Sequence, residues 1–249
     1  MRSRNLAILF AGICGYADRL GRQSWEQSQR MMRVHEALFS GAFRALGGRR
    51  IKQIGGTSLV SFDSPTRAVL CAAALRERVE AFNARVSPAE RIDVRAGLHL
   101  GEVRIERGDV FGEAVNIAAR IEAQAGPGEV LLGEALWLSM NRADVKVDDL
   151  GTRELKGVPE PIRVLRLREA ELAKPIAIEL GELPSPERVD LENEITGHLR
   201  AALHAAIRRA EEKVPDAADR TRVFIGAGLA AMAAVGSAVV ALARFGGKP

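Results

Sequence analysis

The chain has 249 residues, of which 47% are hydrophobic and 27% are charged. This composition is typical of a folded protein with an apolar core and excludes a chain that is disordered throughout. The formal net charge is +4, but acidic residues are interleaved with the basic ones and only 4% of residues are aromatic. We therefore expect a mildly basic surface and no nucleic-acid partner.

The first two thirds of the chain alternate between strand-like and helix-like segments. Continuous or alternating apolar positions predict strands, apolar positions at helical spacing predict helices, and glycine pairs predict turns. The expected elements are a strand at 6–11, a helix at 23–46, a hairpin at 51–62 turning at Gly55-Gly56, a helix from Pro65 capped by Ser64, a strand at 92–105, a helix at 113–123, and strands at 129–132 and 162–167. This order is β-α-β-β-α-β with additional elements, and it predicts a ferredoxin-like α+β sandwich.

Both cysteines, Cys14 and Cys71, lie in apolar runs. The sequence allows a disulfide between them, but two separate buried thiols in a reducing cytoplasm are the simpler interpretation. No CxxC or HxxxH spacing supports a structural zinc site. The short basic N-terminus leads directly into the first predicted strand, which does not fit a cleaved signal peptide.

The composition changes after about Glu169. We interpret residues 170–189, which contain three prolines, as a linker. Residues 190–222 carry apolar positions at helical spacing and predict an amphipathic helix, for which packing on protein is favoured over lying on lipid.

Residues 223–243 contain no charged residue and are bounded by Arg222 and Arg244. This length and composition predict a transmembrane helix, with a buried soluble helix as the alternative. More basic residues precede this segment than follow it, which keeps the N-terminal domain in the cytoplasm. We therefore expect a single-pass C-terminal membrane anchor.

Several stretches of the predicted domain at residues 1–169 resemble class III adenylyl and guanylyl cyclases. They occur in the family's order and at domain-scale spacing, and the resemblance ends near Glu169. The stretches are AILFAGICGY at 7–16, KQIGG at 52–56, RAGLHLGE at 95–102, GDVFGEAVNIAAR at 108–120 and LKG at 155–157.

The resemblance implies a site for ATP cyclisation that normally holds two divalent cations. In family members that bind metal, one Asp ends the first strand and a second lies at the hairpin tip. Here these positions hold Gly12 and Gly56, so no metal ligand is expected from either. Asp18 and Asp63 are several residues out of register and do not replace them. We expect no cofactor on this chain alone, and Mg²⁺ or Mn²⁺ with ATP only where a partner supplies the carboxylates.

The other functional positions of the family are matched. Lys52 and Asp109 correspond to the pair that selects adenine, and Lys156 to the lysine that contacts the terminal phosphates. Asn116 and Arg120 lie four residues apart on one predicted helix, so both project from the same face. In the family this Asn orients the ribose and this Arg stabilises charge on the α-phosphate.

Each of these residues also has an ordinary structural interpretation. The charged ones would be solvated surface groups on composition alone, Asn116 could bond locally, and Arg120 could pair with Glu113 or Glu122. His99 is expected to be a core histidine rather than a ligand. Only the joint occurrence in family order favours a functional role.

Three functions are compatible with these positions. The favoured one is an adenylate cyclase-like domain in cyclic-nucleotide signalling, acting as the complementary half of a heterodimeric cyclase. The alternative is a pseudoenzyme, a membrane-tethered module that binds nucleotide or dimerises. An active homodimeric cyclase is disfavoured because both of its sites would lack the carboxylates, which costs several kcal/mol of transition-state stabilisation.

Overall fold

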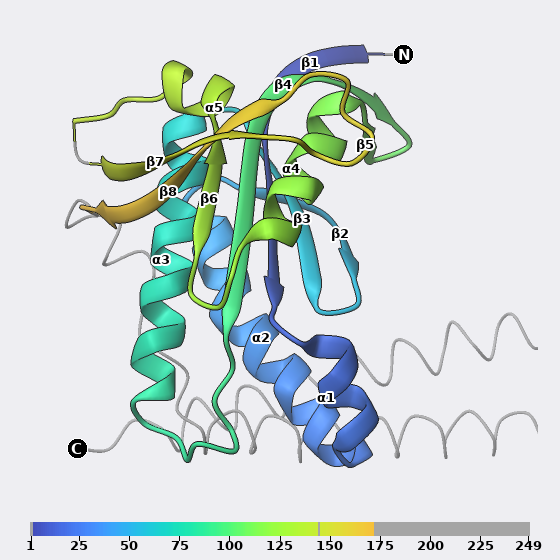
Figure 1. Cartoon of the computed structure of the whole chain (residues 1–249). Helices are drawn as coiled ribbons and strands as arrows, with labels where there is room; N and C mark the ends of the chain where they lie inside the picture. Colours follow the sequence, from blue (N-terminus) through green and yellow to red (C-terminus); the bar gives the residue numbers. More distant parts are fainter. Residues whose placement is uncertain (1, 144, 172–249) are drawn as a thin grey trace, which may run out of the picture. The chain divides into compact units, whose positions relative to one another are not determined.

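The computed structural model describes residues 2–143 and 145–171 (Figure 1). Its strands are β1 (Arg2–Ile13), β2 (Arg49–Ile54), β3 (Thr57–Phe62), β4 (Val94–Glu106), β5 (Asp109–Phe111), β6 (Val130–Gly133), β7 (Val145–Arg153) and β8 (Ile162–Ala170). Its helices are α1 (Tyr16–Arg22), α2 (Trp25–Ala45), α3 (Pro65–Asn83), α4 (Glu113–Gln124) and α5 (Glu134–Ser139). The prediction of a mixed α+β fold is confirmed.

Two of the helices begin at serine caps. Ser24 accepts a hydrogen bond from the backbone N–H of Gln27, whose side chain in turn accepts from the N–H of Ser24, so α2 starts with a complete capping box. Ser64 accepts from the N–H of Arg67 and is followed by proline at the first position of α3, as expected from the sequence.

The eight described strands form one sheet whose main path is β2-β3-β1-β4-β6-β8-β7, with β5 paired to β4. Strand β1 lies between β3 and β4 and is antiparallel to both, so that Leu9 is opposite Val60 on one side and Leu98 on the other. The order β2-β3-β1-β4 of the first four strands is that of a βαββαβ ferredoxin-like unit. β4 and β6 are parallel, and β6, β8 and β7 extend the sheet by antiparallel pairing.

Helices pack against both faces of the sheet. Alternate side chains of β1, among them Ile8 and Phe10, form an apolar cluster with Ala114 and Ala118 of α4. On the opposite face Ala11 borders the same small gap as residues of α2 and α3. Because β1 carries helices on both sides, the whole run from Leu6 to Ala11 is buried, as its continuous apolar sequence predicts.

Strand β2, at the edge of the sheet, contains a β-bulge. Arg50 pairs with Val60, whereas Lys52 pairs with Leu59, so Ile51 is an extra residue in the ladder. Leu59 belongs to the cluster beneath α4, and Ile51 packs against the same cluster. The bulge therefore places Lys52 on the α4 face of the sheet.

The structure adds four elements to those expected from the sequence. Helix α1 buries none of its residues, β5 has three residues, α5 has six, and apolar and charged residues alternate in edge strand β7 only over 145–148. None of these has the long apolar period that predicts an element from sequence.

The cysteines are free thiols, Cys71 buried and Cys14 half-buried, so the expectation of two buried thiols is correct for Cys71 only. His99 is a buried core histidine, as predicted. The predicted linker at 170–189 lies almost wholly beyond the described residues, and the predicted helices at 190–222 and 223–243 lie entirely beyond them. None of the helices in residues 2–143 and 145–171 has the length and apolar character that a membrane crossing requires.

Candidate functional site

An open cleft of about 680 Å³ lies on the α4 side of the sheet, between β2, β5, α4 and the loop that precedes β8. Lys52 comes from β2 and Asn116 from the first turns of α4, so the cleft brings together two residues that the sequence singled out. The residues that line it are Lys52, Val110, Phe111, Gly112, Glu113, Val115, Asn116, Gly157 and Pro159.

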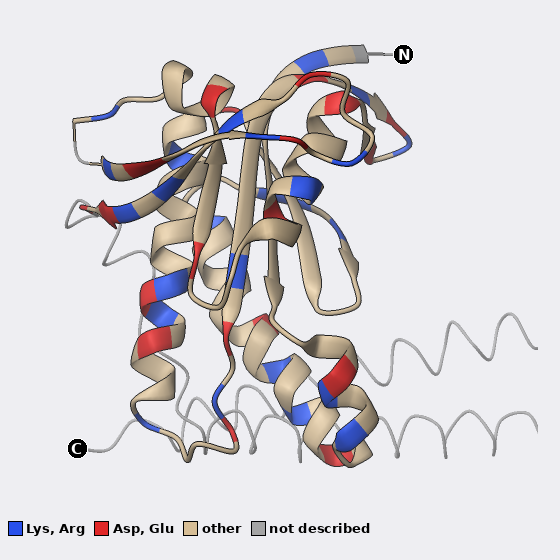
Figure 2. Ribbon diagram, viewed as in Figure 1, with Lys and Arg blue, Asp and Glu red and all other residues tan. Residues whose placement is uncertain are grey.

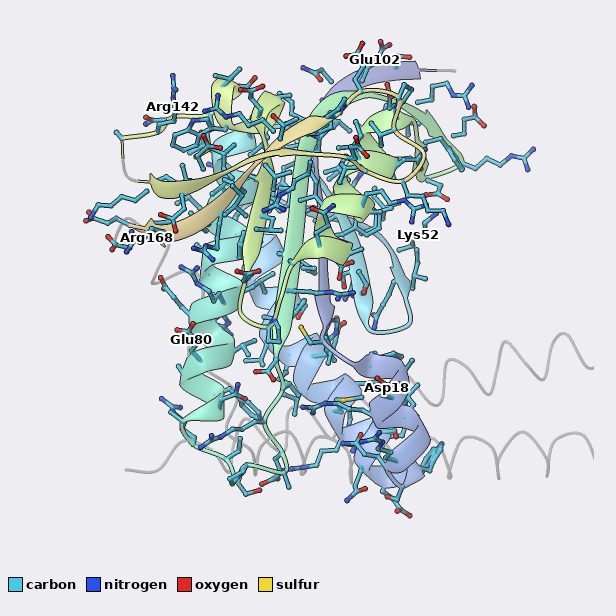
Figure 3. The ribbon with its side chains drawn as sticks, in the orientation of Figure 1. Asp18, Lys52, Glu80, Glu102, Arg142 and Arg168 are labelled. Atoms are coloured by element: carbon cyan, nitrogen blue, oxygen red, sulfur yellow. The ribbon has the colours of Figure 1, made fainter. Side chains whose placement is uncertain are left out.

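Lys52 and Asp109 form an ion pair at the edge of this cleft. Lys52 Nζ is 2.6 Å from Asp109 Oδ2, while Asp109 Oδ1 accepts a hydrogen bond of 2.8 Å from the backbone N–H of Val110. The hydrogen bond from Lys52 is the main cause that lowers the pKa of Asp109 below its usual value. Lys52 Nζ also lies 5.8 Å from the centroid of the Phe111 ring, and Figure 3 shows Lys52 beside the outer edge of the sheet.

Asn116 and Arg120 lie one turn apart on α4, and both are exposed. Their position depends on close contact between α4 and β4, since a Cβ at Gly97 of β4 would lie 2.1 Å from the backbone nitrogen of Glu122. Glu122 forms an ion pair with Arg95 at 2.7 Å, and Arg120 has no ion pair among the described residues. The alternative that Arg120 serves to pair with Glu113 or Glu122 is therefore wrong.

Lys156 lies on the loop between β7 and β8, next to the cleft rather than in it. It lines a second hollow of about 390 Å³ together with Pro159, which also lines the cleft. Leu155 is buried and anchors the loop, which leaves the side chain of Lys156 exposed. The two hollows thus adjoin along this loop.

Gly12 and Gly56 lie side by side at the turn of the β2–β3 hairpin. The backbone N–H of Ile13 donates to the carbonyl oxygen of Gly56 at 3.1 Å, and Gly12 is paired with Thr57 in the sheet. Gly12 near the end of β1 and Gly56 in the turn between β2 and β3 are thus neighbours in the fold. The hydroxyl of Thr57 and the ring of Tyr16 occupy the space beside the two glycines.

These two positions do not fit a pair of divalent cations, because such cations at phosphate sites are held through one or two carboxylates and glycine supplies none. Asp63 follows the far end of β3 and pairs with Arg4 at 2.8 Å, and Asp18 projects from α1 (Figure 3). In the part of the chain that the structure describes, His, Cys, Asp and Glu side chains form no group of three or more placed to bind a metal ion.

Comparison with known protein families identifies the family of this domain. Residues 1–168 match the model of the adenylate and guanylate cyclase catalytic domain. The chain belongs to this family. The resemblance that its motifs suggested is thereby confirmed.

Two curated proteins and one solved structure illustrate the relationship. Putative adenylate cyclase 3 of Rhizobium meliloti is 33% identical over 66% of this chain, and the serine/threonine-protein kinase pkn2 of Myxococcus xanthus is 33% identical over 70% of it. The matches span 28% and 21% of those two proteins, respectively. An adenylate/guanylate cyclase/hydrolase from Silicibacter pomeroyi has a TM-score of 0.61 at 30% identity, covering 67% of this chain and 97% of that one.

Sequence reasoning missed several residues of the cleft. Phe111 is an exposed aromatic residue between two matched positions, and this unusual exposure is visible only in the structure. Glu113 and Pro159 also line the cleft but carry no signal of their own in the sequence.

Lys, Arg, Asp and Glu are interleaved on β7 and β8, where they form ion pairs instead of a patch of one sign (Figure 2).

Proposed function

We propose that this chain is the nucleotide-holding half of a two-chain adenylate cyclase, which converts ATP to cyclic AMP only with a partner that supplies the metal-binding carboxylates. One observation carries this proposal. The cleft side of the domain keeps Lys52 paired with Asp109 and places Lys52 and Asn116 in one hollow, while Gly12 and Gly56 offer no ligand.

Cyclisation joins the 3′ oxygen of ATP to the α-phosphorus, breaks the bond from that phosphorus to the bridging oxygen and releases pyrophosphate, while the hydroxyl proton passes to solvent. In this proposal Lys52 donates to a ring nitrogen of adenine and Asp109 accepts from the exocyclic amine. Asn116 orients the ribose, Arg120 stabilises charge that develops on the α-phosphate, and Lys156 binds the terminal phosphates.

The same geometry argues against activity of two identical copies. A homodimer would bring Gly12 and Gly56 to both of its sites, so each would lack the groups that hold cations. Losing this stabilisation costs several kcal/mol, which corresponds to several powers of ten in rate. The partner must therefore be a different cyclase chain whose two aspartates are present.

A second function, a nucleotide-binding or dimerising module without catalysis, is favoured by the Lys52–Asp109 pair. These two groups are hydrogen-bonded to each other at 2.6 Å, so neither charge needs a purine as its partner. A module of this kind would bind a partner domain and report to other proteins. Both functions take place at a membrane if residues 223–243 form the anchor that their sequence predicts.

The test mixes the full-length chain with a metal-competent cyclase chain whose own transition-state asparagine and arginine have been changed to alanine. That partner contributes only carboxylates, so cyclic AMP forms only where this chain completes the site. We expect cyclic AMP from the mixture and none from either chain alone. Asn116→Ala or Arg120→Ala should lower the rate by about 10²–10³-fold.

Arg85→Ala is the matched control, because Arg85 is an exposed arginine in the turn that follows α3 and has no ion pair among the described residues. It should leave the rate of the mixture unchanged. ATP binding without turnover in the mixture would favour the non-catalytic module instead. Substantial turnover by this chain alone would contradict both functions.

A further inference from the structure

Glycine at positions 12 and 56 is required by space and not by backbone conformation. Neither residue has a φ angle in the left-handed region that favours glycine, whereas the neighbouring Gly55 does, with φ of 57°. Any residue could therefore adopt the backbone conformation at 12 and 56. What surrounds each Cα decides whether a side chain can be accommodated.

At Gly12 the obstacle is Thr57 on the paired strand. A Cβ at Gly12 would lie 2.2 Å from Thr57 Oγ1 and 3.0 Å from Thr57 Cβ. Opposite Cβ atoms in an antiparallel pair are normally about 4.5–5.5 Å apart. Rotation of the Thr57 side chain moves the hydroxyl but leaves the Cβ in place, so β1 and β3 would have to separate.

At Gly56 the obstacle is the ring of Tyr16, the first residue of α1. A Cβ at Gly56 would lie 2.7 Å from Tyr16 Cγ and Cδ2, and 3.0 Å from Tyr16 Cβ. The close contact at Tyr16 Cβ means that a rotation of the ring alone cannot clear the space. The ring also lies against Gly55, where a Cβ would be 3.2 Å from Tyr16 Cε1.

We propose that the Thr57 side chain and the Tyr16 ring fill the volume that metal-binding carboxylates at positions 12 and 56 would need, so the chain excludes a cation pair through its packing as well as through its missing ligands. The inference deepens the proposed function, on which it rests for the assignment of 12 and 56 as ligand positions. A simple exchange of glycine for aspartate would thus strain the fold instead of restoring a metal site.

Alanine tests the space without adding charge. We expect Gly12→Ala and Gly56→Ala to lower the melting temperature of the full-length chain. Gly21→Ala is the control, because a Cβ at Gly21 on α1 meets nothing within 4 Å, and it should not lower the melting temperature. Thermal unfolding followed by circular dichroism measures all three.

Double-mutant cycles then identify the obstacle at each position. Thr57→Gly should suppress most of the effect of Gly12→Ala, and Tyr16→Ala should suppress most of the effect of Gly56→Ala. The crossed pairs, Thr57→Gly with Gly56→Ala and Tyr16→Ala with Gly12→Ala, should be additive. Additive effects in the matched pairs, or no loss of stability in either glycine variant, would overturn the proposal.

Manganese binding gives a second readout that does not depend on activity. The free Mn²⁺ signal in electron paramagnetic resonance reports binding to the full-length chain without a partner. We expect no binding by the Gly12→Asp, Gly56→Asp variant in the otherwise native chain, and binding once Thr57→Gly and Tyr16→Ala are added. Binding by the first variant at native stability, or no binding by a folded second variant, would overturn the proposal.

These measurements separate the inference from the function on which it rests. Unfolding and Mn²⁺ binding are measured on this chain alone, whereas the proposed function is measured as cyclic AMP made with a partner. If the mixture fails to make cyclic AMP while the cycles show the expected coupling, the packing inference stands and the functional proposal fails. If the mixture makes cyclic AMP while the cycles show no coupling, the functional proposal stands and the packing inference fails.

Discussion

Lys52 and Asp109 are separated by 57 residues in the sequence, yet their side chains are joined by a hydrogen-bonded ion pair of 2.6 Å. Lys52 comes from edge strand β2 and Asp109 from the short strand β5. In the proposed function a purine bonds to both groups, and the Lys52 ammonium keeps two further N–H donors and the Asp109 carboxylate keeps free lone pairs for it. The pair is therefore the most direct point at which to test nucleotide selection.

Lys52→Met should reduce the discrimination between ATP and GTP without unfolding the domain. Loss of a charged hydrogen bond to the base costs about 1.5–3 kcal/mol, which corresponds to about tenfold or more in affinity. The melting temperature should hardly change, because exposed ion pairs contribute only ~0–1 kcal/mol. Competition between ATP and GTP in the two-chain cyclase assay measures the selectivity.

Lys146→Met is the control for this substitution. Lys146 pairs with Glu169 at the same 2.6 Å separation, but on β7 and β8, away from the cleft. It removes an equivalent ion pair and should leave nucleotide selectivity unchanged. Equal changes in selectivity for the two variants would contradict a role of Lys52 in base recognition.

Gly97→Ala should be among the most destabilising single substitutions in the domain. The added Cβ would lie 2.1 Å from the nitrogen and 2.5 Å from the Cα of Glu122, both backbone atoms of α4. Backbone cannot yield as a flexible side chain can, so we expect a loss of about 3 kcal/mol or more in the free energy of unfolding. Urea unfolding of the full-length chain measures the loss.

Gly101→Ala provides a graded comparison on the same strand. There the added Cβ would meet the Cβ of Ala114 at 2.9 Å, with the nearest backbone atom at 3.9 Å. We expect a smaller loss, of about 1–3 kcal/mol. A Gly101 variant as unstable as the Gly97 variant would show that contact with the backbone of α4 is not what sets the effect.

The sequence predicted the elements that are buried by their apolar pattern. The run from Leu6 to Ala11 became β1, and the Ser64-Pro65 pair marks the start of α3. Helix α1 was not predicted because none of its residues is buried, which leaves no apolar period to detect. Strand β7 was missed because its apolar and charged residues alternate only over 145–148, which is too short a pattern to separate a strand from a loop.

The candidate site was predicted less from residue properties than from family resemblance. Taken singly, Lys52 and Asp109 would each be interpreted as an ordinary charged residue on the surface. No local sequence pattern indicates that their side chains are in contact. The structure brings them together, and it puts Asn116 in the same cleft as Lys52. The packing of Tyr16 and Thr57 beside the two glycines could not be predicted, because it depends on the spacing of β1, β3 and α1.

Acid should destabilise the domain from about pH 6.5 downward, because two histidines, His35 and His99, are buried. Among the described residues, His35 Nδ1, His35 Nε2 and His99 Nδ1 have no hydrogen-bond partner. Burial lowers the pKa of His35 and of His99 from 6.5 to about 4. Between these values the unfolded chain binds protons that the folded chain does not, so stability is lost as the pH falls. Each histidine contributes roughly 3 kcal/mol of this loss when it is complete near pH 4.

His35→Phe should remove about half of this pH dependence. The ring of His35 lies 4.0 Å from that of Phe39, so a phenyl group fits an already apolar and aromatic position. The nearby charges are Glu36, which raises the pKa of His35, and Arg50, which lowers it. Urea unfolding at pH 7, 6 and 5 measures the slope, and an unchanged slope in the variant would rule out His35 as a source.

Membrane attachment can be tested by one charge in the predicted anchor. Ala234→Arg places a guanidinium near the centre of residues 223–243, at a cost of about 2.5–3.5 kcal/mol for insertion. We expect the variant to shift from the membrane fraction to the soluble fraction after alkaline extraction. Ala217→Arg, before the segment, should remain with the membrane. A native chain found in the soluble fraction would contradict the anchor.

The extra residue in β2 determines which side of the sheet carries the lysine. If Ile51 were paired with Leu59 in a regular ladder, Lys52 would be opposite Ser58 instead of Leu59, and its side chain would point away from Asp109. The irregular pairing also interrupts the row of free amide and carbonyl groups along the outermost strand, which discourages edge-to-edge growth of the sheet with other chains. One additional residue thus both sets the side of the sheet on which Lys52 lies and discourages association with other chains at this edge.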